Sequence, residues 1–178
     1  VRWRLVAAGV LVSVLFENAR FGWLCAAFAR TPLAVVAVVE GTVMGGGFGL
    51  ACAADVTLAH ASASFRLPET SLGLVPAQIA PYLVERLGFA EAKRLAVTGG
   101  RLDAPTALTL RLVHELAGDE AALAAALARV LGEILACAPG AVAATKRLIG
   151  QARLAAPESL IDEAAAVFSA SAQGAEGT

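Results

Sequence analysis

A predicted buried strand followed by three consecutive glycines is the feature of this sequence that most restricts its fold. Leu33–Val39 is uninterrupted by polar residues and rich in valine, which predicts a strand covered on both faces, as in a parallel sheet. Gly45–Gly47 then leads into the alanine-rich segment Phe48–Ala54, which we expect to be helical. Because Asp55–Ala59 predicts the next strand, the chain is expected to form a parallel βαβ unit and an α/β fold.

The second half of the chain is predicted to be helical. Ser64–Leu67 predicts a third short strand, and beyond Pro81 we expect only helices. Gly88 and the pair Gly99–Gly100 are placed where glycine commonly ends a helix, and Asp103 is the predicted N-cap of the helix that follows. Further helices are expected at residues 121–136, 141–154 and 158–170.

Composition excludes several functional classes. With 14 basic and 15 acidic residues and a pI near 6.2, no nucleic-acid partner is expected. Apolar residues make up 58% of the chain and charged residues 16%, which predicts a buried core rather than disorder. Uncharged stretches such as Leu5–Phe16 are shorter than the ~18–20 residues of a membrane-spanning helix, so no membrane association is expected.

The opening segment Val1–Phe16 is basic and then apolar, a pattern also typical of a secretory signal. No small-x-small cleavage site follows it, and Glu17–Arg20 leads directly into sequence that predicts a helix. Secretion is therefore not expected.

Cysteine and histidine spacing predicts neither disulfides nor a metal site. Cys25, Cys52 and Cys137 are odd in number and widely spaced, so we expect three buried, reduced thiols and a cytoplasmic protein. His60 and His114 have no carboxylate or cysteine at ligand spacing, which argues against a metal centre.

The glycine triplet could also form a binding site for an anion. A helix N-terminus presents unpaired N–H groups and a partial positive charge, and glycine lets a ligand approach the backbone closely. Gly45–Gly47 therefore predicts an oxyanion site. A phosphate site is less well supported, because neither a Lys-Ser/Thr pair nor a G-x-G-x-x-G pattern is present. Close packing of the helix is the remaining interpretation.

Glu69 is the other candidate for chemistry. It follows Pro68 at the end of a predicted short strand, with apolar neighbours at Leu67 and Leu72. A carboxylate in such surroundings is suited to proton transfer. The alternative is a surface glutamate in a turn.

Taken together, these segments resemble the enoyl-CoA hydratase/isomerase (crotonase) family. The resemblance covers about half of the chain and is carried by Gly41–Leu50, Asp55, Phe65–Glu69, Leu72–Pro76, Leu95–Gly99 and Ala107–Val113. It implies an α/β fold with a partial crotonase-like ββα spiral core and a helical C-terminal subdomain. The expected divisions are a non-family apolar segment at 1–19, the partial core at 20–118 and the partial helical subdomain at 119–178.

The resemblance also implies roles for individual residues. Gly46 is expected to supply an oxyanion-hole N–H to the thioester carbonyl, and Glu69 to be the catalytic carboxylate. The residues implied to contact substrate are Gly45, Gly49, Pro68 and Ala77. The implied partner is an acyl-CoA thioester whose coenzyme A belongs to the substrate, so no separate cofactor or metal is implied. The usual family assembly is a homotrimer or a dimer of trimers.

Departures from the family pattern narrow this prediction. Typical hydratases carry a second glutamate where this chain has Gly49, and Val75–Pro81 replaces a glycine-rich family loop. These features resemble the branch that hydrates glutaconyl-type thioesters in terpene or leucine catabolism, such as isohexenylglutaconyl-CoA and methylglutaconyl-CoA. Arg111 occupies a position where the family often has a helix-ending glycine.

The expected activity is hydration of an α,β-unsaturated acyl-CoA thioester. The alternatives are a Δ3,Δ2-enoyl-CoA isomerase that uses a single glutamate, and an inactive acyl-CoA-binding or structural remnant. Family members carry further strands before the equivalent of Thr31 and a short helix after the equivalent of Thr178. The chain therefore resembles a family core without its two ends.

Overall fold

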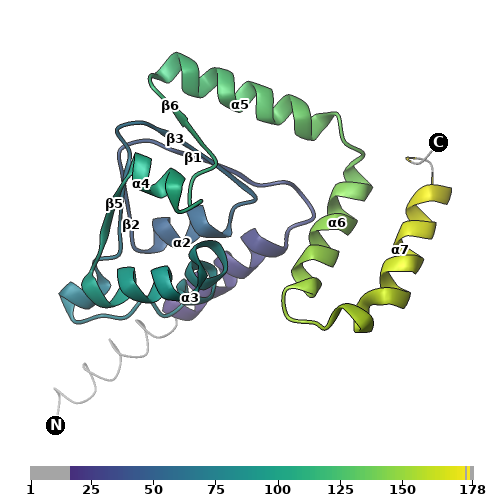
Figure 1. The fold of residues 1–178 in the computed structure, drawn as a ribbon, viewed down its shortest axis with the longest axis horizontal. Coiled ribbons are helices and arrows are strands. Elements are labelled where there is room, and N and C mark those ends of the chain that lie inside the picture. Colours follow the sequence, from purple (N-terminus) through teal and green to yellow (C-terminus); the bar gives the residue numbers. More distant parts are fainter. Residues whose placement is uncertain (1–16, 175, 177–178) are drawn as a thin grey trace, which may run out of the picture.

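The computed structural model describes residues 17–174 and 176. Two small sheets form the centre of the molecule (Figure 1). One sheet has the order β1-β3-β6 with all strands parallel, and the other has the order β2-β4-β5 with only β5 antiparallel. The strands are β1 (Val36–Val39), β2 (Thr42–Met44), β3 (Val56–His60), β4 (Ser64–Arg66), β5 (Arg101–Asp103) and β6 (Glu115–Ala117).

Helices surround the sheets and continue beyond them. In Figure 1, α2 lies against the sheets, α3 packs against α2, α5 follows one side of the core, and α6 and α7 form a hairpin beside it. Residues 17–30 are helical. The remaining helices are α2 (Gly46–Ala53), α3 (Ala80–Thr98), α4 (Ala104–Thr109), α5 (Glu120–Leu135), α6 (Pro139–Ala152) and α7 (Ile161–Gln173), with 3-10 turns at Glu69–Leu72 and Pro157–Leu160.

The predicted βαβ unit is confirmed, with one unpredicted addition. β1 and β3 pair in parallel, with Val36 opposite Val56, and α2 lies between them in the sequence. The predicted strand at Leu33–Val39 is shorter than expected, because only its last four residues pair. After a turn at Gly41, where φ is 66°, the chain forms β2 in the other sheet before α2 begins.

The expectation of an all-helical chain beyond Pro81 is wrong. β5 pairs with β4, where Leu102 lies opposite Phe65, and β6 extends the first sheet beside β3. Each new strand has only three residues, too few to produce a clear alternating pattern. Their strand conformation depends on partners that are distant in the sequence.

The predicted helix ends are confirmed. Gly88 interrupts α3 with φ 74°, and Gly99 ends α3 with φ 60°. Asp103 caps α4, because its carboxylate accepts a hydrogen bond from the Thr106 N–H at 2.9 Å. Arg111 has φ 58° and is the only non-glycine residue with positive φ in the described part of the chain. Its left-handed backbone matches the position where the family often has glycine.

Two apolar clusters form the core. The larger one lies around α2 and α3 and contains Phe48 and Phe65, whose rings meet edge to face with centroids 5.8 Å apart. The smaller one packs α5 against the first sheet through Leu58, Leu123 and Val130. These clusters fix the two sheets relative to α2. The N-terminus of α2 forms part of the candidate site.

The cysteine prediction is wrong at one position. Cys25 and Cys52 are buried free thiols, and burial raises the pKa of Cys52 to about 12. Cys137 is exposed, because it lies in the connection between α5 and α6 rather than against the core.

In residues 17–174 and 176, no single helix is long and apolar enough to cross a membrane. α5 and α6 meet the length and composition criteria only as a pair, and they are bent by 97° relative to each other.

Candidate active site

The first turn of α2 provides the backbone of the site. Gly45 precedes the helix with φ 53°, and its N–H donates to the Arg66 carbonyl at 3.2 Å. This bond ties the start of α2 to the end of β4. Gly46 is the first residue of α2, where the helix itself offers no acceptor for the backbone N–H. The partial positive charge of the helix start adds to the attraction for a negatively charged oxygen.

A side chain is not tolerated at Gly46. A Cβ added there would stand 2.8 Å from Cζ of Phe21, in the helix at residues 17–30. Glycine is therefore required for Phe21 to pack over the start of α2. The sequence singled out the glycine but not its aromatic neighbour.

Glu69 lies beside this helix start. It begins the 3-10 turn that follows β4, and the turn ends at Gly73 with φ 72°. Its Oε1 atom lies 3.2 Å from the position that a Cβ on Gly45 would occupy. Its Oε2 atom is buried and has no hydrogen-bond partner among the described residues. A buried carboxylate oxygen without a partner is costly, so it is well placed to receive a hydrogen bond from a ligand.

Gly46 and Glu69 line the same cavity of about 530 Å³. Its walls come from the helix at residues 17–30, the start of α2, the Glu69 turn and the segment before α3. The lining residues are Asn18, Phe21, Gly46, Glu69, Leu74, Val75, Pro76, Ala77, Gln78 and Ile79. A backbone donor and a carboxylate on one cavity can stabilise an oxyanion and move a proton.

The other predicted site residues are placed differently. Ala77 lines the cavity, whereas Gly45, Gly49 and Pro68 are not among its lining residues. Gly45 leaves space for the Glu69 carboxylate, and Pro68 immediately precedes the turn that carries Glu69.

Gly49 has a packing explanation. A Cβ at this position would lie 2.1 Å from Cγ2 of Ile79 and 2.6 Å from its Cβ, and both residues are buried. Ile79 thus occupies the space into which a side chain at position 49 would project. The sequence contained one indication that Ile79 lies near Gly49. Gly49 replaces the family glutamate, and the loop Val75–Pro81, which contains Ile79, also departs from the family pattern.

A separate polar cluster lies at the other end of α2. The Arg86 guanidinium donates to the Cys52 carbonyl at 3.0 Å and also to the Ala54 carbonyl, which stabilises the C-terminus of the helix. Arg86 Nη1 lies 3.0 Å from Nε2 of His114, whose Nδ1 accepts the Thr57 N–H at 2.9 Å. Partial desolvation and the nearby Arg86 charge lower the pKa of His114.

Asp55 connects the core to α6. Its carboxylate accepts hydrogen bonds from the Val35 N–H at 2.7 Å and from Lys146 Nζ at 2.6 Å. These contacts give Asp55 a structural role. In the part of the chain that the structure describes, no group of three or more His, Cys, Asp or Glu side chains could hold a metal ion.

Solved structures define the class of fold. AtuE from Pseudomonas aeruginosa is 45% identical, with a TM-score of 0.91 over 96% of this chain and 67% of that chain. An enoyl-CoA hydratase/isomerase from Marinobacter aquaeolei is 44% identical, with a TM-score of 0.87 over 90% of this chain and 61% of that chain. The α/β crotonase-like fold expected from the sequence is therefore confirmed.

The chain belongs to the enoyl-CoA hydratase/isomerase family, whose model matches residues 18–176. Enoyl-CoA hydratase ACTT6 from Alternaria alternata is 34% identical over 122 residues, covering 68% of this chain and 41% of the relative. Carnitinyl-CoA dehydratase from Citrobacter koseri is 36% identical over 115 residues, covering 64% of this chain and 44% of the relative. The chain thus spans about two fifths of the length of these curated relatives.

Proposed function

We propose that the protein hydrates an α,β-unsaturated acyl-CoA thioester, with Glu69 as the acid/base and the Gly46 N–H as an oxyanion donor. The observation that carries this proposal is the unpartnered Glu69 Oε2 in a cavity that Gly46 also lines. Family membership supports the same class of reaction.

In the proposed reaction, Glu69 takes a proton from water while the water oxygen bonds to the β-carbon. The α,β π bond breaks, and its electron pair moves through the α-carbon to the thioester oxygen. The Gly46 N–H and the start of α2 stabilise the resulting enolate. Glu69 then returns a proton to the α-carbon, so the thioester gains one water and the carboxylate ends in its original state.

Because the site offers a single carboxylate, both proton transfers, from water and to the α-carbon, are assigned to Glu69. Gly49 has no side chain, and Ile79 covers it, so position 49 offers no second acid. We therefore assign removal and return of the proton to Glu69 in sequence. A carboxylate on the substrate could assist, which fits the glutaconyl-type substrates, such as isohexenylglutaconyl-CoA, suggested by the resemblance around Glu69 and Val75–Pro81.

The remaining site residues receive supporting roles. Ala77 forms part of the wall for the acyl chain. Gly45 and Gly49 provide space for Glu69 and Ile79, while Pro68 sets the backbone before the turn. A homotrimer or dimer of trimers and a cytoplasmic location stay predictions. Exposed apolar side chains such as Leu154 and Phe168 favour assembly.

A Δ3,Δ2-enoyl-CoA isomerase is the second candidate, and the single carboxylate favours it. One glutamate can remove a proton from the α-carbon and return it to the γ-carbon, with the same enolate held by Gly46. The mass of the product separates the two reactions, because hydration adds one water and isomerisation leaves the mass unchanged.

The deciding experiment measures turnover of crotonyl-CoA and glutaconyl-CoA by the purified protein, through enoyl absorbance and product mass. Glu69→Gln is expected to lower kcat by ~10²–10⁴, because it removes the proton-transfer group while keeping its shape. Glu40→Gln, at an exposed position, is the matched control and should leave kcat unchanged.

Lack of turnover of both thioesters by the parent protein would overturn the hydratase proposal. Equal kcat in Glu69→Gln and the parent would remove Glu69 from the mechanism. Equal rates on the two thioesters would remove the assistance by a substrate carboxylate.

A further inference from the structure

The proposed catalytic cavity contains two amides that the hydration mechanism does not use. Asn18 comes from the helix at residues 17–30, and Gln78 comes from the segment just before α3. Gln78 Nε2 donates to Asn18 Oδ1 at 2.8 Å. Although these residues are 60 positions apart in sequence, the fold brings them to the cavity that Glu69 also lines.

The position of the Gln78 side chain depends on the absence of a side chain at Gly22. A Cβ added to Gly22 would lie 2.3 Å from Gln78 Oε1, 2.8 Å from its Cδ and 3.3 Å from its Cγ. Gln78 therefore lies directly against the backbone of the helix at residues 17–30. Because Asn18 and Gly22 are four positions apart, they occupy the same face of that helix.

The amide pair has unused hydrogen-bonding capacity. The bond between the two side chains occupies one Gln78 N–H and one Asn18 oxygen. It leaves the Asn18 amino group and the second Gln78 N–H as donors. No lysine or arginine is among the cavity-lining residues that the structure describes, and Phe21, Leu74 and Val75 add apolar surface.

We propose that Asn18 and Gln78 bind a free carboxylate at the distal end of the acyl group. A carboxylate has only acceptor oxygens, so it matches the free N–H groups, and hydrogen bonds to a charged partner are the stronger kind. A lysine or arginine in the cavity would form an ion pair with Glu69. Neutral amides bind the carboxylate of the ligand without doing so. A purely apolar acyl chain offers these donors no acceptor.

This inference rests on the proposed thioester site and names the substrate class that it selects. Binding of two saturated thioesters, glutaryl-CoA and butyryl-CoA, is measured by calorimetry, because neither can be hydrated. Only glutaryl-CoA carries the distal carboxylate. We expect it to bind the parent protein about 10- to 100-fold more tightly, the ratio that corresponds to hydrogen bonds to one charged group.

Gln78→Glu distinguishes a role of Gln78 in binding the ligand carboxylate from a purely structural role in its hydrogen bond to Asn18. A glutamate at 78 can still accept a hydrogen bond from the Asn18 amino group, but its charge repels a second carboxylate. Glutaryl-CoA should lose at least about tenfold in affinity, and butyryl-CoA should change far less. Gln173→Glu makes the same charge change on α7 and is the control, expected to leave both affinities unchanged.

Gly22→Ala tests the position of the Gln78 amide without removing a polar group. Its methyl group displaces the Gln78 amide, so the preference for glutaryl-CoA should decrease while the protein stays folded by circular dichroism. Equal affinities of the parent for the two thioesters, or equal losses of both in Gln78→Glu, would overturn this inference alone. Failure of both thioesters to bind the parent would overturn the proposed function as well.

Discussion

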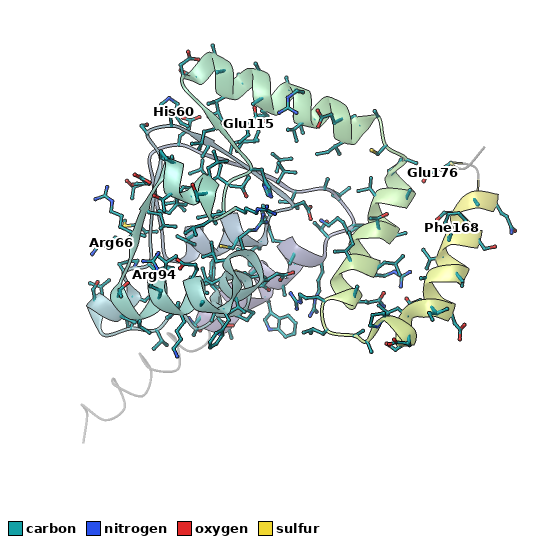
Figure 2. The ribbon with its side chains drawn as sticks, viewed as in Figure 1. His60, Arg66, Arg94, Glu115, Phe168 and Glu176 are labelled. Carbon is teal, nitrogen blue, oxygen red and sulfur yellow. The ribbon has the colours of Figure 1, made fainter. Side chains whose placement is uncertain are left out.

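The core around α2 and α3 and the hairpin of α6 and α7 use similar apolar residues in opposite ways. Phe65 and Leu95 are fully buried in the core, whereas neither α6 nor α7 contains a buried residue. Figure 2 labels Phe168 on α7, on the far side of α6 from the sheets, and its side chain is 76% exposed. An amphipathic sequence can form a helix, but burial of its apolar face requires a surface to cover it.

Polar contacts hold the hairpin where apolar packing holds the core. Lys146 Nζ donates to the Leu33 carbonyl at 2.7 Å and to the Asp55 carboxylate. The Glu176 carboxylate accepts the Gly140 N–H at 3.1 Å, at the start of α6. Because such contacts compete with water, the hairpin should open more easily than the core.

Matched phenylalanine truncations test this contrast most strongly. Phe65→Ala should lower the free energy of unfolding by about 3–5 kcal/mol, because it leaves a cavity in the core. Phe168→Ala should change it by less than about 0.5 kcal/mol. Both are measured by denaturant unfolding at equal protein concentration. A similar loss in the two variants would show that Phe168 is covered in solution.

Matched glycine substitutions test the packing of the site. Gly49→Ala should destabilise the protein by about 1–3 kcal/mol, because its methyl group overlaps Ile79. Gly132→Ala, where the new methyl group would meet nothing within 4 Å beyond the backbone of its own helix, should stabilise α5 by up to about 1 kcal/mol. Thermal unfolding compares the two variants. A neutral Gly49→Ala would contradict the close approach of Ile79.

Removal of the Lys146 ammonium tests the polar attachment of the hairpin. Lys146 and Asp55 have side chains only 17% and 33% exposed, so Lys146→Met should cost about 1 kcal/mol. Limited proteolysis should cut residues 139–173 sooner in this variant. Lys93→Met, on the exposed surface of α3, should leave the cleavage rate unchanged. Equal rates in the two variants would mean that other contacts hold the hairpin.

The pH dependence of stability should show a smaller effect from His114. Its folded-state pKa lies below the ordinary value of 6.5, so the unfolded chain binds the proton more readily. The stabilising contribution is present above about pH 6.5 and is lost as pH falls through the lower folded-state pKa. His114→Gln should therefore flatten the pH dependence of the unfolding free energy below pH 6.5. An unchanged slope in that variant would contradict this assignment.

Local features could be predicted because neighbouring residues determine them. Gly88 and Gly99 end helical segments, since glycine readily adopts positive φ. Asp103 caps α4 through a residue three positions away, and the parallel pairing of β1 with β3 follows from one strand–helix–strand pattern. The family resemblance used the same contiguous motifs. The proximity of Glu69 to the start of α2 followed from that resemblance rather than from spacing.

The sequence alone thus determined the helix-ending glycines Gly88 and Gly99, the Asp103 cap and the family, because each depends on contiguous residues. Only the tertiary structure placed Ile79 over Gly49, joined Gln78 to Asn18 and paired β5 and β6 with the sheets. It also showed that Cys137 is exposed. These contacts connect segments that local preferences do not relate, and they form only when burial of the common core brings those segments together.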